Sequence, residues 1–168
     1  MKKIISGMLL TAATAGAAAA EPGVYYGAGL GLWSVDFAGL DAQAAQVRGQ
    51  VGYRFNDFVA VEGSLHNYFE AEDNGIEFDA FGAQLAVRPS FPLSDAIEGY
   101  ARLGWGYYDA EASGFGVGVD TTDDEFVWGI GTNFKVSERV GVYVEYSDPF
   151  DSEADVFTLG FTYHPQGR

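Results

Sequence analysis

The feature that most constrains this chain is an alternation of two residue sets, repeated in eight stretches, in which one set carries no charged residue. Between residues 59 and 65, for example, every second residue is apolar or glycine, whereas the residues between them include Glu62 and Ser64. A period of two belongs to β-strands, because successive side chains of a strand point to opposite faces. One face free of charge on eight strands predicts a continuous surface that avoids water. The other face holds Arg, Glu, Gln and Gly, which fits a barrel with lipid outside and a polar interior.

The alternation therefore predicts an all-β fold, an eight-stranded antiparallel up-and-down transmembrane β-barrel. The predicted strands cover residues 24–33, 45–55, 58–69, 78–87, 97–108, 126–136, 140–146 and 156–163. The strictness of the apolar face has a physical reason, since a Lys or Arg that faces lipid at the bilayer midplane costs about 2–4 kcal/mol. Exposed faces of these strands end in aromatic residues at both ends, as expected for the two membrane interfaces.

The connections between the predicted strands alternate in character. Those at 56–57, 89–96 and 137–139 are short and rich in turn-forming residues. Those at 34–44, 70–77, 109–125 and 147–155 are longer, hold most of the Asp and Glu of the chain, and contain no Lys, Arg or His. Short periplasmic turns with longer extracellular loops are the pattern of outer-membrane barrels. The even number of strands then places both ends of the barrel in the periplasm.

The N-terminus predicts export. Lys2 and Lys3 precede a short apolar run that ends in Ala18-Ala19-Ala20, which is the pattern of a cleaved secretory signal peptide over residues 1–20. Residues 21–168 are then one barrel domain. The chain has no cysteine and a formal net charge of −15. Such acidity argues against nucleic-acid binding, which needs basic surface to neutralise phosphates.

Four segments carry a family resemblance: 25–31 (YYGAGLG), 61–63 (VEG), 100–104 (YARLG) and 159–163 (LGFTY). With the signal peptide, they resemble the small OmpA/OmpX-type outer-membrane β-barrels, often called porin-family β-barrel proteins. The resemblance covers essentially the whole mature chain. It implies a monomer in the outer membrane of a Gram-negative cell. The implied partners are the membrane lipid, lipopolysaccharide and the outer-membrane assembly machinery.

Charged residues on the inward face are the first candidate site. An eight-stranded barrel is just wide enough for side chains to fill, so charges inside it must pair. We expect a salt-bridge plug that holds the register and excludes water. The resemblance also allows an alternative, a gate whose pairs exchange partners to admit ions. Counting residues from the turns places four of them near mid-height of the barrel: Arg48, Glu62, Arg102 and Glu145. The same count places four others toward the periplasmic end: Arg54, Arg88, Glu98 and Lys135.

The acidic loops are the second candidate site. Asp120, Asp123, Asp124 and Glu125 are spaced closely enough to share a loosely bound Ca²⁺ or Mg²⁺, although no EF-hand spacing is present. No other cofactor is indicated. Divalent ions at such loops would bridge them to lipopolysaccharide phosphates, whereas without ions the loops form a solvated anionic surface.

Catalysis is the third possibility. Glu62, Ser64 and His66 share the inward face, but neighbours at this spacing on a strand are commonplace, so we expect no enzyme. The sequence thus predicts a non-enzymatic barrel that serves envelope integrity or surface interaction through its acidic loops, with a small ion-conducting channel as the alternative. A soluble lipocalin-type barrel is a third interpretation. The glycine-rich polar face argues against it, because such a face makes a poor soluble exterior.

Overall fold

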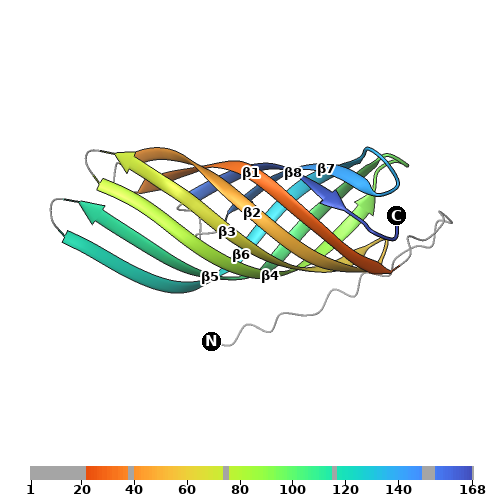
Figure 1. Ribbon diagram of the computed structural model, residues 1–168, viewed down its shortest axis with the longest axis horizontal. Helices are drawn as coiled ribbons and strands as arrows, with labels where there is room; N and C mark the ends of the chain where they lie inside the picture. The colour runs from red at the N-terminus through yellow and green to blue at the C-terminus, as the bar shows by residue number, and fades with distance from the viewer. Residues whose placement is uncertain (1–21, 38–39, 74–75, 115–116, 149–153, 168) are drawn as a thin grey trace, which may run out of the picture.

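The computed structural model describes residues 22–37, 40–73, 76–114, 117–148 and 154–167. These residues form eight antiparallel strands, each hydrogen-bonded to its neighbour in sequence, and β1 pairs with β8 to close the barrel (Figure 1). The predicted fold class is confirmed. The predicted signal peptide lies outside the described residues. The strands are β1 (Gly23–Phe37), β2 (Leu40–Asn56), β3 (Val59–Asp73), β4 (Ile76–Pro92), β5 (Ile97–Gly114), β6 (Val117–Lys135), β7 (Val140–Asp148) and β8 (Ala154–Tyr163).

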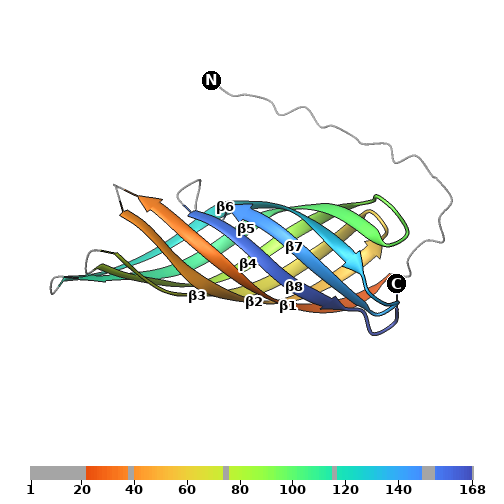
Figure 2. The same cartoon turned by 90° about the horizontal axis from the view of Figure 1, so that it is seen from above.

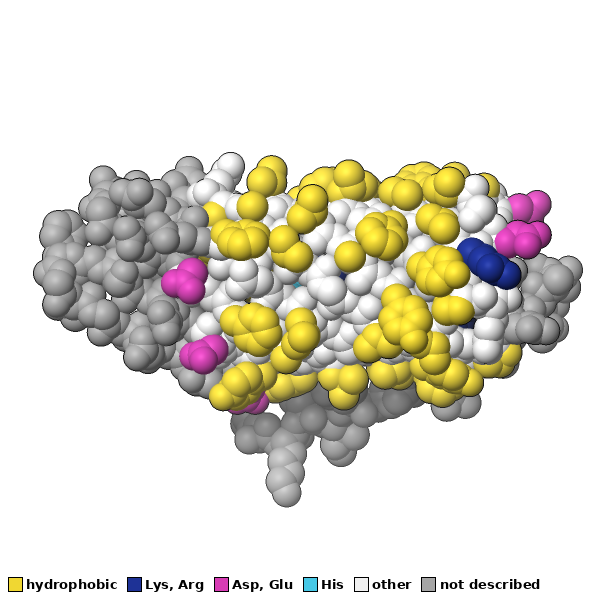
Figure 3. All heavy atoms as spheres, in the orientation of Figure 1, with side chains coloured by type: hydrophobic (Ala, Val, Ile, Leu, Met, Phe, Trp, Pro, Cys, Tyr) yellow, Lys and Arg dark blue, Asp and Glu magenta, His cyan; other side chains and the backbone are white. Residues whose placement is uncertain are grey.

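The outer surface of the barrel is apolar over its middle. Exposure follows the predicted alternation on the strands, so that Leu30, Leu32 and Leu85 are each more than 60% exposed while their strand neighbours face the interior. On the face drawn in Figure 3, hydrophobic side chains cover the middle of the molecule, and the visible charged side chains lie toward its two ends. No helix of the length and hydropathy needed to cross a bilayer occurs among the described residues. A barrel with an apolar exterior and no disulfide bonds is stable where lipid surrounds it.

The two ends of the barrel differ. One end, here called the turn end, carries the β2–β3, β4–β5 and β6–β7 connections together with the first residue of β1 and the last of β8. The other, here called the acidic end, carries the β1–β2, β3–β4, β5–β6 and β7–β8 connections (Figure 2). The described residues of the segments predicted as long acidic loops are mostly strand: β5 and β6 continue their pairing to Gly114 and Val117. The prediction of loop over these residues was wrong, because the hairpin ladders persist where the residues become acidic.

Side-chain oxygens cap all three connections at the turn end. Asn56 Oδ1 accepts the backbone N–H of Phe58 at 2.8 Å and that of Val59 at 3.0 Å. Ser94 Oγ and Ser137 Oγ each accept two backbone N–H groups, from the first residue of β5 or β7 and from the residue before it. Such side-chain caps mimic a backbone turn and hold it tight. These caps therefore fix where the strands that follow the three connections begin.

Tyrosine–glycine pairs fill the interior between neighbouring strands. In the register, each of four inward tyrosines stands directly opposite a glycine on the adjacent strand. Its ring occupies the place that a side chain would take: a Cβ on Gly82, Gly131 or Gly160 would lie 2.5 Å from a ring atom of the tyrosine opposite. Each of the glycines in these pairs therefore leaves the space that the tyrosine ring of the adjacent strand occupies. The pairs are Tyr25 with Gly52, Tyr100 with Gly131, Tyr108 with Gly82, and Tyr143 with Gly160.

Candidate functional site

The first half of the lumen network is centred on Glu145 of β7. Arg48 of β2 reaches across the interior and donates to both carboxylate oxygens, at 2.5 and 3.3 Å. Arg102 of β5 contacts Glu145 Oε1 at 3.0 Å and donates to Ser64 Oγ at 3.4 Å. Tyr100 donates its hydroxyl to Glu145 Oε2 at 3.0 Å. One buried carboxylate thus binds two guanidinium groups and a phenol that come from two other strands, β2 and β5.

The second half lies toward the turn end and involves Glu62 and Glu98. Arg88 of β4 joins them, with 3.2 Å to each carboxylate. Arg54 of β2 pairs with Glu98 at 3.0 Å. Tyr25 of β1 donates its hydroxyl to Glu62. In this half, the positive charges of two arginines therefore balance the negative charges of two glutamates.

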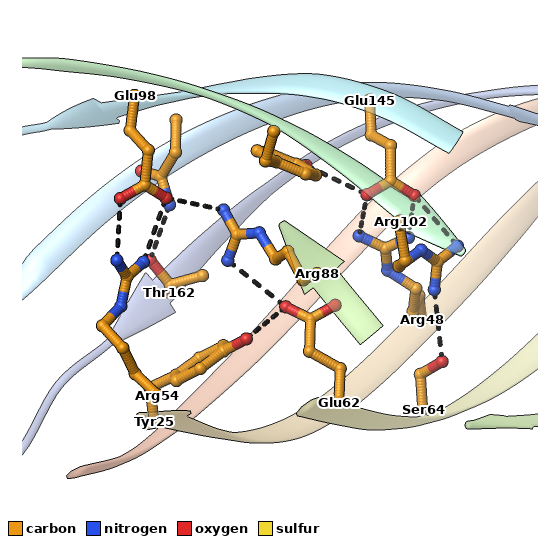
Figure 4. Close-up of polar contacts among 12 residues, drawn as sticks. Tyr25, Arg48, Arg54, Glu62, Ser64, Arg88, Glu98, Arg102, Glu145 and Thr162 are labelled. Atoms are coloured by element: carbon orange, nitrogen blue, oxygen red, sulfur yellow. Dashed lines mark hydrogen bonds and ion pairs between the residues drawn. The ribbon is translucent and has the colours of Figure 1, made fainter. Parts of the chain in front are cut away.

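Tyr100 connects the two halves. Its hydroxyl bonds Glu145, and the guanidinium of Arg88 lies over its ring, 3.8 Å from the ring centroid. A cation over an aromatic face is held by the ring quadrupole, more strongly where water is absent. Three of the five ion pairs found among the described residues join strands that are not neighbours, such as β2 to β7 and β2 to β5 (Figure 4), whereas the two ion pairs of Arg88 join β4 to the adjacent strands β3 and β5. The network therefore combines contacts across the barrel interior with contacts between adjacent strands.

The network is buried. Arg48, Arg88 and Arg102 are at most 2% exposed, and Glu62 and Glu145 are also 2% exposed. Removing one member of a buried pair costs about 3–5 kcal/mol, since the partner is left as an unpaired charge. In the half centred on Glu145, two arginines pair with one glutamate. The positive charges of both arginines are therefore compensated by that single carboxylate.

Ring systems close the lumen on either side of the network. Toward the acidic end, Trp33, Tyr68 and Tyr108 pack together in one cluster with smaller apolar residues. Toward the turn end, the chain continues past β8. There the backbone N–H of His164 donates to the carbonyl of Arg139 at 2.8 Å, and the buried imidazole stacks on Tyr25 at 5.0 Å. With rings at both ends and ion pairs between them, side chains fill the interior.

Seven of the eight residues predicted for the lumen lie in these contacts. Two placements differ from the sequence-based expectation. Glu62, expected at mid-height beside Arg48 and Arg102, pairs with Arg88 nearer the turn end. Strands in a barrel are tilted, so equal counts from the turns do not give equal heights. Lys135, expected inside, is an exposed side chain in the last position of β6 and makes none of the ion pairs found among the described residues.

The lumen tyrosines were not predicted as site residues. Tyr25 and Tyr100 each hold a carboxylate of the network, and the guanidinium of Arg48 lies 5.0 Å from the ring centroid of Tyr143. A signal was available, because these residues fall on the polar set of their strands together with an excess of glycine. Large rings on a face of small residues indicate rings that lie across neighbouring strands.

Ser64 and His66 do form a hydrogen-bonded pair, with 2.9 Å between Ser64 Oγ and His66 Nε2. The other ring nitrogen of His66 lies 3.3 Å from Gln46 Oε1, so an amide occupies the place that a carboxylate holds in a catalytic triad. Glu62 is engaged by Arg88 and Tyr25 instead. All of these side chains are buried in the filled lumen, and the pair serves as part of the packing.

The predicted cation site falls on β6. Asp124 is exposed and accepts a hydrogen bond from Trp105 Nε1 at 2.8 Å, whereas Glu125 is half-buried. Consecutive residues of a strand face opposite sides, so these two carboxylates do not converge on one ion. The side chains of Asp120 and Asp123 lie outside the described part, and a cation at this segment stays a prediction. No group of three or more metal-ligating side chains occurs among the described side chains.

A closed barrel of eight antiparallel strands with an apolar exterior and a filled polar lumen is the architecture of a small membrane barrel. The family model of the outer membrane protein beta-barrel domain matches residues 5–164, and the chain belongs to this family. It is a small integral outer-membrane β-barrel with transmembrane strands. No curated protein matches the chain.

Solved structures of small outer-membrane barrels share the fold. Neisserial surface protein A is similar with a TM-score of 0.70 and 15% identity, over 88% of this chain and 99% of that one. Ail, the attachment invasion locus protein of Yersinia pestis, was solved with the heparin analogue sucrose octasulfate. It gives a TM-score of 0.64 and 22% identity, over 86% of this chain and 99% of that one. OprG of Pseudomonas aeruginosa gives 0.57 and 15%, over 84% and 95%.

Proposed function

We propose that this protein is a non-enzymatic outer-membrane barrel with a closed lumen, which serves envelope integrity or surface interaction through its acidic end. The filled interior carries the proposal. Three arginines and two glutamates of the ion-pair network are at most 2% exposed, and rings pack on both sides of them. A barrel with no open path acts through the surfaces at its ends. In this proposal the signal peptide is removed on export, the turn end faces the periplasm and the acidic end faces outward.

Charge supports a cationic rather than an anionic partner at the acidic end. Residues 109–125 include six acidic residues and no Lys, Arg or His. The relative Ail was solved with a heparin analogue, which is polyanionic. A surface of the same sign as its ligand repels it, so this chain would instead attract basic protein segments. Divalent cations that bridge the carboxylates to lipopolysaccharide phosphates would serve envelope integrity at the same end.

The alternative function is a small ion channel gated by the lumen pairs. One observation favours it. Arg88 contacts two different glutamates, and Glu145 is shared by two arginines, so exchange of partners needs only small side-chain movements. Such exchange would open a path only if the rings at both ends also moved.

Planar-bilayer conductance of the refolded protein tests the proposal against this alternative. A closed barrel gives a silent bilayer across a range of voltages and pH values. Discrete, reproducible openings that disappear in Arg102→Met would contradict the closed barrel and favour the gate. Arg139→Met is the matched control, because it changes an exposed arginine of the β6–β7 connection. Its bilayer conductance should equal that of the parent protein.

A further inference from the structure

The residues that follow β8 fold back over the turn end of the lumen. The backbone N–H of His164 donates to the carbonyl of Arg139 at 2.8 Å, and the N–H of Gly167 donates to the carbonyl of His164 at 3.1 Å, which closes a four-residue turn. Gly167 has a φ of 85°, in the left-handed region that favours glycine. A Cβ added to it would lie 3.8 Å from the carbonyl oxygen of Glu138. The turn therefore lies against the β6–β7 connection.

His164 is the buried side chain of this turn. It is 3% exposed, whereas Pro165 and Gln166 are exposed. Its imidazole stacks on the ring of Tyr25, with 5.0 Å between the ring centroids and 22° between the ring planes. Tyr25 in turn donates its hydroxyl to Glu62, which Arg88 binds (Figure 4). The imidazole therefore covers the turn-end half of the ion-pair network.

The buried charges in this half balance while His164 is neutral. The ion pairs join two arginines with two glutamates: Arg54, Arg88, Glu62 and Glu98. The guanidinium of Arg88 also lies 6.0 Å from the centroid of the Tyr25 ring, on which His164 stacks. The other charged residues around this end are exposed or half-buried, where water screens them: Asp57, Asp95, Lys135, Glu138 and Arg139. A protonated imidazole would raise the buried positive charges to three against two carboxylates, and such an excess is costly.

Histidine is the side chain that ordinarily gains its charge between about pH 8 and about pH 5. We infer that residues 164–167 are a proton-sensitive lid over the turn end of the lumen. The neutral imidazole of His164 closes the lid on Tyr25, and the imidazolium leaves the stack for water. The movement exchanges the ring stack and the two backbone hydrogen bonds for contacts with water, so it needs no change in the strands.

Opening of the lid admits water to the turn-end half of the network. The cluster of Trp33, Tyr68 and Tyr108 lies toward the other end of the lumen and has no part in the movement. The barrel thus stays closed from end to end, and the proposed function does not depend on the lid. The lid adds a response to pH on the side that the proposal assigns to the periplasm.

Thiol reactivity measures the opening, because the chain has no cysteine of its own. The reporter is Ser90→Cys, on the turn-end side of Arg88 in β4. Ser90 is 2% exposed, and its hydroxyl has no hydrogen-bond partner among the described residues, so a thiol replaces it with little disturbance. The probe is 2,2′-dipyridyl disulfide, which reacts with thiols at acid as well as neutral pH. Each rate is divided by that of Asp95→Cys, an exposed position at the same end.

The rate at Ser90→Cys, in refolded protein in lipid nanodiscs, should rise at least tenfold from pH 8 to pH 5. His164→Phe in the same background keeps a ring on Tyr25 but takes no proton, so the thiol should react slowly at both pH values. His164→Ala removes the ring, and the thiol should react rapidly at both. Gln166→Ala, an exposed change in the same turn, should behave as the reporter alone. Resistance of the unheated protein to SDS verifies that each variant is folded.

Three results would overturn the lid. Equal rates at the two pH values in Ser90→Cys exclude a proton-sensitive opening. A slow rate in His164→Ala at pH 8 shows that the imidazole does not close this end. A rise at pH 5 that persists in His164→Phe assigns the proton to another group, such as Glu62 or Glu98.

A second reporter separates the lid from the proposed function. Val127→Cys lies in the ring cluster toward the acidic end, where Val127 is 2% exposed, and it should react slowly at both pH values. Slow reaction there together with a failed lid leaves the closed lumen intact. Rapid reaction of Val127→Cys in the folded protein contradicts the closed lumen itself, and it also overturns an opening confined to the turn end.

Discussion

The carboxylate of Glu145 should be the most costly side chain to remove from the lumen. It accepts three hydrogen bonds, two from Arg48 and one from Tyr100, and it forms an ion pair with Arg102, all in a region closed to water. Glu145→Ala leaves both guanidinium groups buried without an anion. Breaking a buried pair in this way costs about 3–5 kcal/mol, and with two arginines dependent on one glutamate we expect the upper part of that range.

Equilibrium unfolding in urea, with the barrel in lipid vesicles and folding followed by tryptophan fluorescence, measures this cost. Glu138→Ala is the matched control, because Glu138 is exposed in the β6–β7 connection and should change the free energy of unfolding by less than about 0.5 kcal/mol. The triple change Arg48→Met, Arg102→Met, Glu145→Leu should recover most of the loss, since apolar replacement of a whole buried group is often neutral. If Glu145→Ala matches its control, the ion pairs do not brace the barrel and the reasoning is refuted.

Three further changes test other parts of the account. Leu85→Arg puts a charge on a position that is 64% exposed to lipid and should lower the yield of SDS-resistant folded protein, at a cost of about 2–4 kcal/mol; a normal yield would show that the strand faces the other way. Gly131→Ala drives a methyl group into the ring of its partner tyrosine and should lower stability by about 1–3 kcal/mol. Gly63→Ala, with no atom within 4 Å, should be tolerated, and equal unfolding midpoints for the two would disprove that the tyrosine ring occupies the space at Gly131. Arg102→Ala should unfold at lower urea than Arg139→Ala, because only Arg102 holds a buried carboxylate; the reverse order would count against the network.

The facing of each strand could be read from the sequence because lipid imposes a strict rule. A charged side chain on the lipid-facing side is costly in every strand. A charged residue such as Arg48, Glu62 or Glu145 therefore shows which of the two alternating sets in its strand faces the lumen. Strand ends were less predictable. Aspartate has low strand propensity, so the acidic parts of β5 and β6 resembled loops, whereas pairing between the two strands continues through them.

The partners within the lumen could not be read from the sequence, because they depend on tilt and on contacts across the barrel. Glu62 is bound by Arg88 and Tyr25, which come from two other strands, and no spacing along the chain indicates this. Lys135 shows a related limit. Alternation alone assigned it to the lumen, but at the end of a strand a long side chain reaches water with little cost.

Chemical accessibility of the lumen arginines tests the closed barrel most directly. Phenylglyoxal modifies arginine side chains that reach water, and mass spectrometry of the folded protein in nanodiscs reports each site. The account predicts rapid modification of Arg139 and protection of Arg48, Arg88 and Arg102, which become reactive only after unfolding. Modification of Arg48 or Arg102 in the folded barrel at the rate of Arg139 would contradict a filled lumen.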